Sequence, residues 1–455
     1  MHAAARAVRM IGGLTFVLLL LAGCGGGDSG SRPQPTPTAN ASPSVTPPTP
    51  TPTASPVSPF TIASGLVSGT GPAVGWSDGR YLVTFSKIDR RPAQDLFGVR
   101  LASDGTSLDD DPVLLSDGSS QLALDPTSAA YGYAAIAADA AGFGVFFFGS
   151  SDAGAAGLPG EVIAFTSLRE QGAPLPPVTL LAIQLDPRLP QTVLRPPSAA
   201  TSDGARFVAV HQRTEPVLGL SAFDQIVGEL VAVDGGSVEP QGMALLGGAN
   251  VAPAALAYAG AGGVASNGSE TLAAWIEITE QHQKDSTAIE AARIAPGEIT
   301  RLALAETTTG SGSTRVASDG DGFLAVWDAT TEIHAIRYVP HGGAAGSDLV
   351  APPGGFVVAD GSEAKTLSGV AFAGGVYLVT WLEDGVLRGA RVGDGAIAAT
   401  PFTIASGPVT AAAVTSDGER FLVVVERPRG ATSDLLGLFV QPASPPASRG
   451  SIWIP

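Results

Sequence analysis

Residues 318–327 read Ser-Asp-Gly-Asp-Gly-Phe-Leu-Ala-Val-Trp, a turn sequence followed by an apolar stretch that places Phe323 and Trp327 four residues apart. Asp-Gly is typical of β-hairpin turns, because it accepts the positive φ angles that a type I′ turn requires. Residues i and i+4 on a strand share one face, so each such pair forms one packing surface with the aliphatic residue between them. We therefore predict an antiparallel hairpin whose second strand carries an aromatic face.

The same pattern occurs seven times after Phe60, with the central turn positions separated by 43 to 64 residues. The turns are Ser77-Asp78-Gly79, Ala138-Asp139-Ala140, Ser202-Asp203-Gly204, Ser266-Asn267-Gly268, Ser318-Asp319-Gly320, Ala373-Gly374-Gly375 and Ser416-Asp417-Gly418. The strands that follow carry the pairs Tyr81/Phe85, Phe143/Phe147, Phe207/His211, Thr271/Trp275, Phe323/Trp327, Tyr377/Trp381 and Phe421/Val425. A third strand is predicted at residues 98–101, 228–231, 291–294, 335–338, 389–392 and 437–440, and a fourth at residues 112–115 and 402–405.

Four-stranded units that are repeated seven times resemble the blades of a seven-bladed β-propeller. The units also resemble repeats of bacterial secreted and lipoprotein chains that read DG-x-Y-L-V-x-W and then G-x-R-V, most closely at residues 375–381 with 389–392. A row of immunoglobulin-like sandwiches needs about 100 residues per domain, which the repeat period does not allow. We therefore expect an all-β fold, a seven-bladed β-propeller with four-stranded antiparallel blades, over residues 60–455.

A second repetition predicts how the ring closes. Phe60-Thr61-Ile62-Ala63-Ser64-Gly65 recurs unchanged as residues 402–407, where it is an outer strand. A propeller is closed most securely when one blade combines strands from both ends of the chain, so residues 60–64 are expected to supply the outer strand of the last blade. The sequence Ser-Ile-Trp-Ile at residues 451–454 is the competing candidate.

The first 24 residues predict export. Two arginines precede an apolar stretch at residues 11–22, which is too short to span a bilayer but typical of a signal peptide. Leu21-Ala22-Gly23-Cys24 resembles the lipobox of bacterial lipoproteins. The resemblance implies a signal peptide at residues 1–23 and a diacylglycerol on the Cys24 thiol, while an ordinary secretory signal with a chance Cys is the alternative. No Asp follows Cys24, so the family's inner-membrane retention signal is absent and an outer membrane is favoured if the cell has two membranes.

Residues 24–59 are expected to tether the anchor to the repeats. Residues 32–59 contain ten prolines in 28 residues, with Thr, Ser and Ala as most of the rest, which predicts a disordered linker. The chain has a net charge of −17, which excludes nucleic acid as a partner because phosphate backbones are repelled. The expected partners are the membrane, through the lipid anchor, and a protein or glycan.

Signals for catalysis and metal binding are sparse. Residues 75–79 match the nucleophile pattern G-x-S-x-G, but a strand follows them, so Ser77 is interpreted as a hairpin residue. His211 stands where other repeats carry Trp and is interpreted as a packed residue rather than a ligand. No catalytic residue, metal ligand or cofactor is assigned. Ca²⁺ at the acidic turns 109–111 and 319–322 is the alternative to solvated turns.

An arginine recurs in the third strands, at Arg100, Arg293, Arg337 and Arg391. A ring of ligand contacts is one interpretation of this recurrence. The favoured interpretation is structural, because a repeated residue is expected to do a repeated job, either stacking on an aromatic ring or pairing with a turn acid.

Binding residues are expected in the turns between second and third strands, which vary most in length. The candidates are Lys87, Arg90, Arg213, Glu277, His282 and Glu383. The leading hypothesis is a monomeric, exported lipoprotein, anchored to the cell envelope, whose propeller is a non-enzymatic scaffold for a protein or glycan. The alternative is a propeller hydrolase or lyase with an active site in the central channel.

Replacing Cys24 by Ser tests the anchor, because serine has no thiol to carry the acyl chain. We expect the Cys24→Ser protein to leave the membrane fraction and to lack the acyl mass in intact-protein mass spectrometry. Ser29→Ala, a matched change in the tether, should preserve both. Unchanged fractionation of the Cys24→Ser protein would refute lipidation.

Overall fold

The computed structural model describes residues within the range 58–442. Its gaps are 67–70, 91–92, 117–129, 152–159, 170–172, 185–191, 216–222, 235–236, 249–256, 260–261, 282–283, 296–297, 308–310, 342–347 and 394–399. The regular elements of the described residues are all β-strands, and no helix among them has the length and apolarity to cross a bilayer. The predicted signal peptide, Cys24, most of the tether, His282 and residues 451–454 lie outside the described residues.

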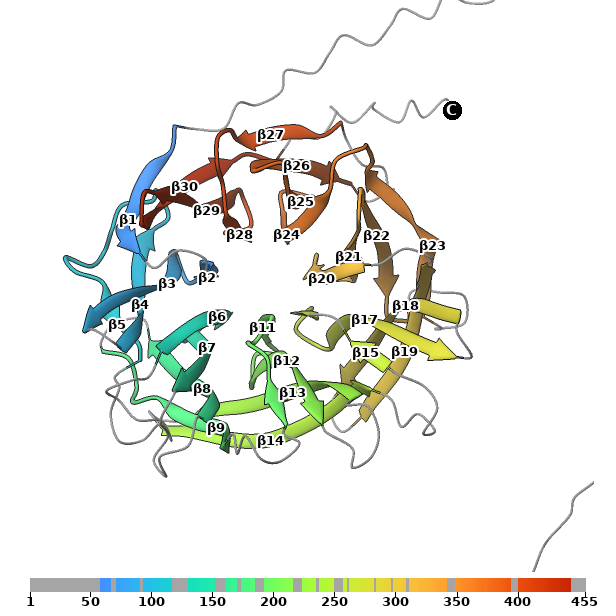
Figure 1. Ribbon diagram of the computed structural model, residues 1–455, viewed down its shortest axis with the longest axis horizontal. Helices are drawn as coiled ribbons and strands as arrows, with labels where there is room; N and C mark the ends of the chain where they lie inside the picture. The colour runs from blue at the N-terminus through green and yellow to red at the C-terminus, as the bar shows by residue number, and fades with distance from the viewer. Residues whose placement is uncertain are drawn as a thin grey trace, which may run out of the picture. The chain divides into compact units, whose positions relative to one another are not determined.

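Each of the seven predicted turns joins two antiparallel strands, which confirms the hairpins. In Figure 1, the labelled strands that come first in each hairpin lie nearest the centre of the ring. The hairpins pair β2 (Ala73–Ser77) with β3 (Arg80–Arg90), β6 (Ala130–Asp139) with β7 (Gly142–Ser151), β11 (Ala199–Ser202) with β12 (Phe207–Glu215), β16 (Gly263–Ser266) with β17 (Thr271–Gln281), β20 (Ser311–Ser318) with β21 (Phe323–Ala329), β24 (Lys365–Ala373) with β25 (Val376–Glu383), and β28 (Ala411–Ser416) with β29 (Phe421–Arg429).

Further strands extend each hairpin outward. The third strands are β4 (Ala93–Ala102), β8 (Gly160–Arg169), β13 (Phe223–Asp234), β18 (Lys284–Ala295), β22 (Glu332–Val339), β26 (Val386–Val392) and β30 (Thr432–Val440), and all but β8 contain a predicted segment. The outer strands are β5 (Val113–Leu114), β9 (Val178–Gln184), β14 (Ser237–Gly248), β19 (Glu298–Thr307), β23 (Leu349–Ala359) and β27 (Phe402–Ala405), of which β5 and β27 match the predicted set. Outer strands are hard to find in the sequence because some carry prolines, such as Pro240 in β14, which are tolerated at sheet edges.

Two inner strands are interrupted. Short β10 (Val193–Leu194) pairs with β12 beside β11, and short β15 (Ala257–Ala259) pairs with β17 beside β16. Pro196 and Pro197 separate β10 from β11, since proline has no N–H group to donate to the neighbouring strand.

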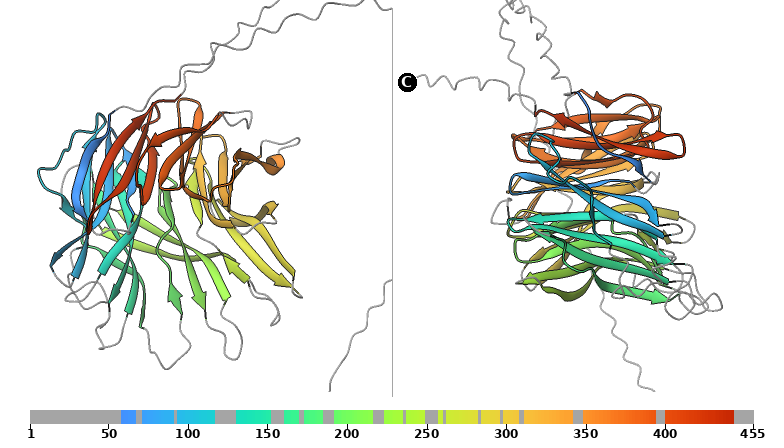
Figure 2. Two further views of the ribbon diagram at one scale, coloured as in Figure 1. Left: turned by 45° about the horizontal axis from the view of Figure 1, so that its top comes forward. Right: turned by 90° about the vertical axis from the view of Figure 1, so that its left-hand side faces the viewer.

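The sheets stand side by side around a central space, which is the arrangement of a β-propeller with antiparallel blades (Figures 1 and 2). Five sheets contain four or five strands each, and one contains eight. In the eight-stranded sheet, β2–β5 and β6–β9 are joined by a single parallel pairing between Gln94 and Ala130.

The predicted type I′ geometry is confirmed at two turns. Asp78-Gly79 and Gly374-Gly375 have positive φ at both central positions. Each is a two-residue loop, because Ser77 pairs with Arg80 and Ala373 pairs with Val376.

The type I′ prediction is wrong at the turns that contain Asp203, Asn267, Asp319 and Asp417. At the first of these, Ser202 pairs directly with Phe207 and leaves a four-residue loop in which only the glycine has positive φ. The Asp203 carboxylate accepts hydrogen bonds from the N–H groups two and three residues later, and the other three turns repeat this geometry. The reason is that these turns have one additional residue between the glycine and the first core position of the following strand. The side chain of Asp or Asn stabilises the longer loop by accepting hydrogen bonds from its N–H groups.

The core lies between neighbouring sheets rather than within one. Phe323 and Trp327 on β21 pack against Leu272 and Ile276 on β17. The same contact recurs around the ring. In each case the second strand of one hairpin packs the face that carries its pair against the second strand of the preceding hairpin, on the face of that strand opposite to its own pair. Every member of the seven predicted pairs is 4% exposed or less, so the predicted packing surface is confirmed.

The closing strand comes from the start of the chain, as predicted. β1 (Phe60–Leu66) pairs antiparallel with β30, the last strand, and completes the sheet β1-β30-β29-β28. The Phe60 ring stacks on Phe439 with ring centroids 5.6 Å apart. A Cβ at Gly105 would lie 2.7 Å from this ring, so glycine provides the space that the ring occupies.

Replacing Phe60 by Ala is expected to lower the free energy of unfolding by about 2 kcal/mol, less than for a fully buried Phe because this ring is half-buried. Denaturant titration measures the loss. Thr61→Ala, at an exposed position of the same strand, should change the free energy of unfolding by less than about 0.5 kcal/mol. Equal effects of the two substitutions would contradict the role of Phe60 in closing the ring.

Candidate binding site in the central cavity

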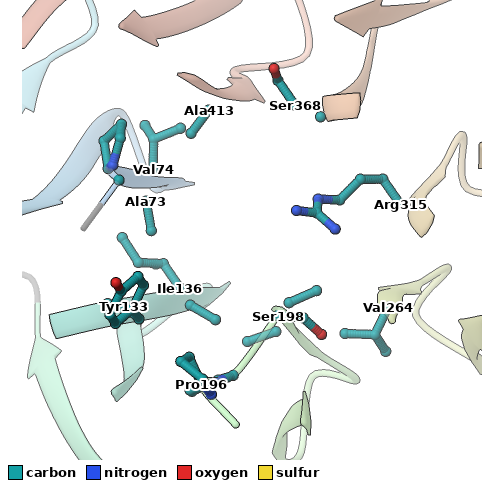
Figure 3. A pocket seen from close by; sticks show the side chains of 18 of the residues that line it. Ala73, Val74, Tyr133, Ile136, Pro196, Ser198, Val264, Arg315, Ser368 and Ala413 are labelled. Atoms are coloured by element: carbon teal, nitrogen blue, oxygen red, sulfur yellow. The ribbon is translucent and has the colours of Figure 1, made fainter. Parts of the chain in front are cut away.

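The inner strands enclose a cavity of ≈ 540 Å³. Small and aliphatic side chains make up most of its wall, among them Val74, Ile136, Val264 and Ala413 (Figure 3). The polar side chains include Ser198, Gln212, Ser368 and two arginines, Arg195 and Arg315. None of the described residues that line the cavity is Asp, Glu or His.

Strand pairing identifies equivalent positions in the seven inner strands. Arg315 pairs with Val326, the residue three positions after Phe323 at the start of the aromatic pair. The corresponding residues in the other hairpins are Ala73, Ala135, Ala199, Gly263, Gly369 and Ala413. Six of the seven equivalent positions thus hold Ala or Gly, and Arg315 is the exception.

The Arg315 side chain extends from β20 toward the middle of the cavity (Figure 3). It is half-buried, because the ring encloses it while the cavity keeps it in contact with solvent. Its Nη1 atom donates a hydrogen bond of 2.8 Å to the carbonyl oxygen of Thr314. Enclosure lowers the pKa of the Arg315 guanidinium below its usual value, and the negative charge of Asp328 acts in the opposite direction.

The backbone that carries Arg315 is firmly held. Asp328 is buried, and its carboxylate accepts hydrogen bonds from the N–H groups of Gly312, Ser313 and Leu367 at 2.9, 2.7 and 3.2 Å. The buried Thr314 hydroxyl donates to the carbonyl oxygen of Ala274 at 2.7 Å. These contacts tie the start of β20 to both neighbouring sheets. They also occupy Asp328, and no ion pair joins a carboxylate to Arg315 among the described residues.

Tyr133 is an unusual residue of the cavity wall. It has a φ of 50°, a left-handed conformation that costs a non-glycine residue about 1 kcal/mol. The pairing of β6 with β7 shifts register between Gly132 and Ala135, so Tyr133 lies in a bulge. The residue is 47% exposed although it is aromatic. The bulge thus places an aromatic ring on the cavity wall instead of in the core.

The binding residues predicted from loop length lie elsewhere. Lys87, Arg213, Glu277 and Glu383 belong to four different second strands, and none of them lines the cavity. Glu277 forms an ion pair with Arg301, and Glu383 lies 3.6 Å from Lys365 and 3.5 Å from Arg388. Arg90 ends β3, and His282 lies outside the described residues.

The third-strand arginines have structural roles, as the favoured interpretation predicts. Arg100 forms an ion pair with Asp109, and Arg293 lies 3.2 Å from Asp348. Arg337 pairs with Asp319, and its guanidinium lies 6.0 Å from the centroid of the neighbouring Tyr377 ring. Arg391 lies over the Phe402 ring at 4.4 Å.

These ion pairs involve both acidic turns that are the alternative Ca²⁺ sites, residues 109–111 and 319–322. Asp109 and Asp319 each direct carboxylate oxygens at an arginine. Within the part of the chain that the structure describes, no group of three or more His, Cys, Asp or Glu side chains is arranged to hold a metal ion.

Ser77 is a hairpin residue and His211 is a packed residue, as predicted. The Ser77 hydroxyl lies in the β2–β3 hairpin and donates to the carbonyl oxygen of Asp139 in β6, the first strand of the next hairpin. His211 is 1% exposed, and its Nε2 atom lies 3.2 Å from the buried Glu229 carboxylate.

Arg315 and Tyr133 are absent from the residues predicted from the sequence. A signal for Arg315 does exist: aligned on the hairpin turns, the inner strands show one arginine in a column of Ala and Gly. The bulge at Tyr133 has no such signal, because a shift of strand register leaves no fixed mark in a sequence.

The sequence matches no protein-family model and no curated protein. Similar solved structures include the β-propeller domain of the Trilobed protease from Pyrococcus furiosus (10% identity, TM-score 0.45, 84% of this chain and 96% of that chain). Others are a prolyl endopeptidase (13%, 0.44, 84% and 51%) and Trypanosoma rangeli sialidase (10%, 0.40, 85% and 58%). The chain spans about half the length of that endopeptidase. With TM-scores below 0.5, these likenesses add nothing to the assignment of the fold or of a function.

The turn aspartates predict acid sensitivity. Burial acts to raise the pKa of Asp319, but hydrogen bonds from the Gly322 N–H group and the Arg337 guanidinium outweigh it and hold the pKa below its usual value. A carboxyl whose pKa is lowered by folding contributes stability above its unfolded pKa, and that contribution is lost as the pH falls through the folded value.

We therefore expect Asp319→Asn to lower the denaturation midpoint at neutral pH, and the difference from the unsubstituted protein to shrink as the pH falls below about 4. Denaturant titrations across this pH range measure both effects. Asp321→Asn, at an exposed position of the same turn, is the matched control and should change little. A difference that stays constant with pH would contradict the assignment.

Proposed function

We propose that this protein is a lipid-anchored binding protein of the cell envelope, in which a seven-bladed propeller holds a ligand at its central cavity. The blade count treats β2–β5 and β6–β9 as two blades, because a single residue pair, Gln94 and Ala130, joins them. With the five other sheets this makes seven, one for each hairpin.

The composition of the cavity wall carries the choice of binding over catalysis. A hydrolase or lyase needs groups that transfer protons, most often His, Asp or Glu, within reach of one another. Among the described lining residues Tyr133 can transfer a proton, but no His, Asp or Glu accompanies it, whereas the wall does include a charged guanidinium held on a rigid strand. A rigid wall with few, well-placed polar groups is typical of a ligand site.

The location rests on the first 59 residues. The lipobox-like sequence Leu21–Cys24 supports an acylated Cys24, and the proline-rich segment that follows supports a flexible tether. This arrangement would present a monomeric propeller to ligands outside the membrane. A protein or a glycan with a part slender enough to enter the cavity is the proposed partner.

Plugging the cavity tests this function. Purified full-length protein is screened against a glycan array and a peptide library, and each ligand found is retested with Ala413→Phe, which places a ring in the cavity. We expect binding to be lost with Ala413→Phe and preserved with Ala140→Phe, which alters an exposed turn residue. Mass spectrometry of the bound ligands should recover them intact. Binding that survives the plug, or recovery of cleaved ligand, would contradict the proposal.

A further inference from the structure

We propose that the central cavity binds a monocarboxylate, whose two oxygens are held by the guanidinium of Arg315. This inference rests on the proposed binding function and names the chemical class of the ligand. Three observations support it. Arg315 occupies a position where the other inner strands hold Ala or Gly, it forms no ion pair with a described carboxylate, and hydrogen bonds hold the strand that carries it.

The register shows that Arg315 is not part of the repeated architecture. The equivalent positions in the other inner strands hold Ala or Gly, so the propeller closes without a long side chain there. The neighbouring Gly263 shows how crowded this level is, because a Cβ there would lie 2.6 Å from the Cα atom of Arg315. An arginine fits only by extending into the cavity, where it contributes nothing to the packing between sheets.

The charge of Arg315 is left for a ligand. The third-strand arginines pair with turn acids or stack on rings, but no described carboxylate forms an ion pair with Arg315. A partly enclosed cation that no carboxylate pairs with directly is costly, and the cost falls when an anion enters. Guanidinium groups bind carboxylates through two parallel N–H···O hydrogen bonds, which gives direction as well as charge.

The guanidinium is also held in place before a ligand arrives. One terminal nitrogen, Nη1, is bound to the Thr314 carbonyl oxygen, and Thr314 is bound in turn to Ala274. The Asp328 carboxylate holds the preceding residues Gly312 and Ser313. A ligand therefore does not have to order this strand, and the entropy cost of binding is reduced.

A monoanion fits this site better than a phosphate. Arg315 extends toward the middle of the cavity and neutralises one negative charge there, whereas Arg195, the other arginine of the wall, is exposed and its charge acts on Glu161. The second charge of a phosphate dianion would therefore lie without its own guanidinium inside a chain whose net charge is −17. The wall also offers aliphatic side chains, the hydroxyls of Ser198 and Ser368 and the exposed ring of Tyr133, which suit a sugar ring or an aliphatic group beside the carboxylate. The carboxylate can come from a uronic acid or from the C-terminus of a peptide.

Two matched ligand pairs distinguish these sources. Full-length protein is titrated by calorimetry with glucuronate and glucose, and with N-acetyl-Ala-Ala and its C-terminal amide. We expect at least one carboxylate to bind, with its neutral partner weaker by about tenfold or more. Binding of glucuronate indicates a uronic acid ligand, and binding of the dipeptide acid indicates a peptide terminus.

Three variants assign the binding to Arg315. Arg315→Ala should abolish carboxylate binding while keeping the denaturation midpoint, because it restores the small residue of the equivalent positions. Arg315→Lys should show intermediate affinity, since it keeps the charge and loses the paired hydrogen bonds. Arg429→Ala, which removes the same charge from an exposed hairpin, should bind as the unsubstituted protein does.

The proposal is overturned if neither carboxylate binds, if Arg315→Ala binds normally, or if inorganic phosphate binds more tightly than both carboxylates. The proposed function fails separately. Ligands that are sensitive to Ala413→Phe but not to Arg315→Ala would refute the carboxylate site and leave the cavity as a binding site.

Discussion

The contact on which the structure depends is the packing of the second strand of each hairpin against the second strand of the next hairpin. Successive residues of a strand face opposite sides of its sheet, so Phe323 and Trp327 face β17 while Leu324 and Val326 face β25. Each sheet is therefore buried on both sides, and its stability depends on having two neighbours. A ring satisfies this requirement for every sheet at once. The pairing of β1 with β30 closes the ring by joining the two ends of the described chain within one sheet.

Crowding at the centre follows from this packing. The inner strands converge, and Gly263 and Gly369 lie so close to the next inner strand that a Cβ would fall within 2.6 and 2.7 Å of its atoms. Glycine at these two positions is thus required by the close approach of the inner strands, and small and aliphatic side chains make up most of the cavity wall. Arg315 differs by directing its length into the open space.

Polar contacts also join neighbouring sheets at the hairpin turns. The Tyr81 hydroxyl donates to the Asp417 carboxylate at 2.8 Å, across the point where the last sheet meets the first. Burial and this hydrogen bond raise the pKa of Tyr81 above its usual value, so the hydroxyl remains a donor. Arg337, Asp319 and Tyr377 form a similar group between two other sheets. The recurring acids and arginines therefore serve architecture, which sets Arg315 apart from them.

The hairpins, the buried pairs and the closing strand could be predicted from the sequence, because turn residues, the period-2 pattern and the repetition at Phe60 are local or periodic features. It also singled out the third-strand arginines as structural. The four-residue turns follow from one additional residue after the glycine, whereas the bulge at Tyr133 and the site at Arg315 emerge only in the folded ring. The bulge and the site depend on which residues oppose one another across strands and on what converges at the ring's centre. Such relations join residues that are far apart in the chain, so no local pattern encodes them.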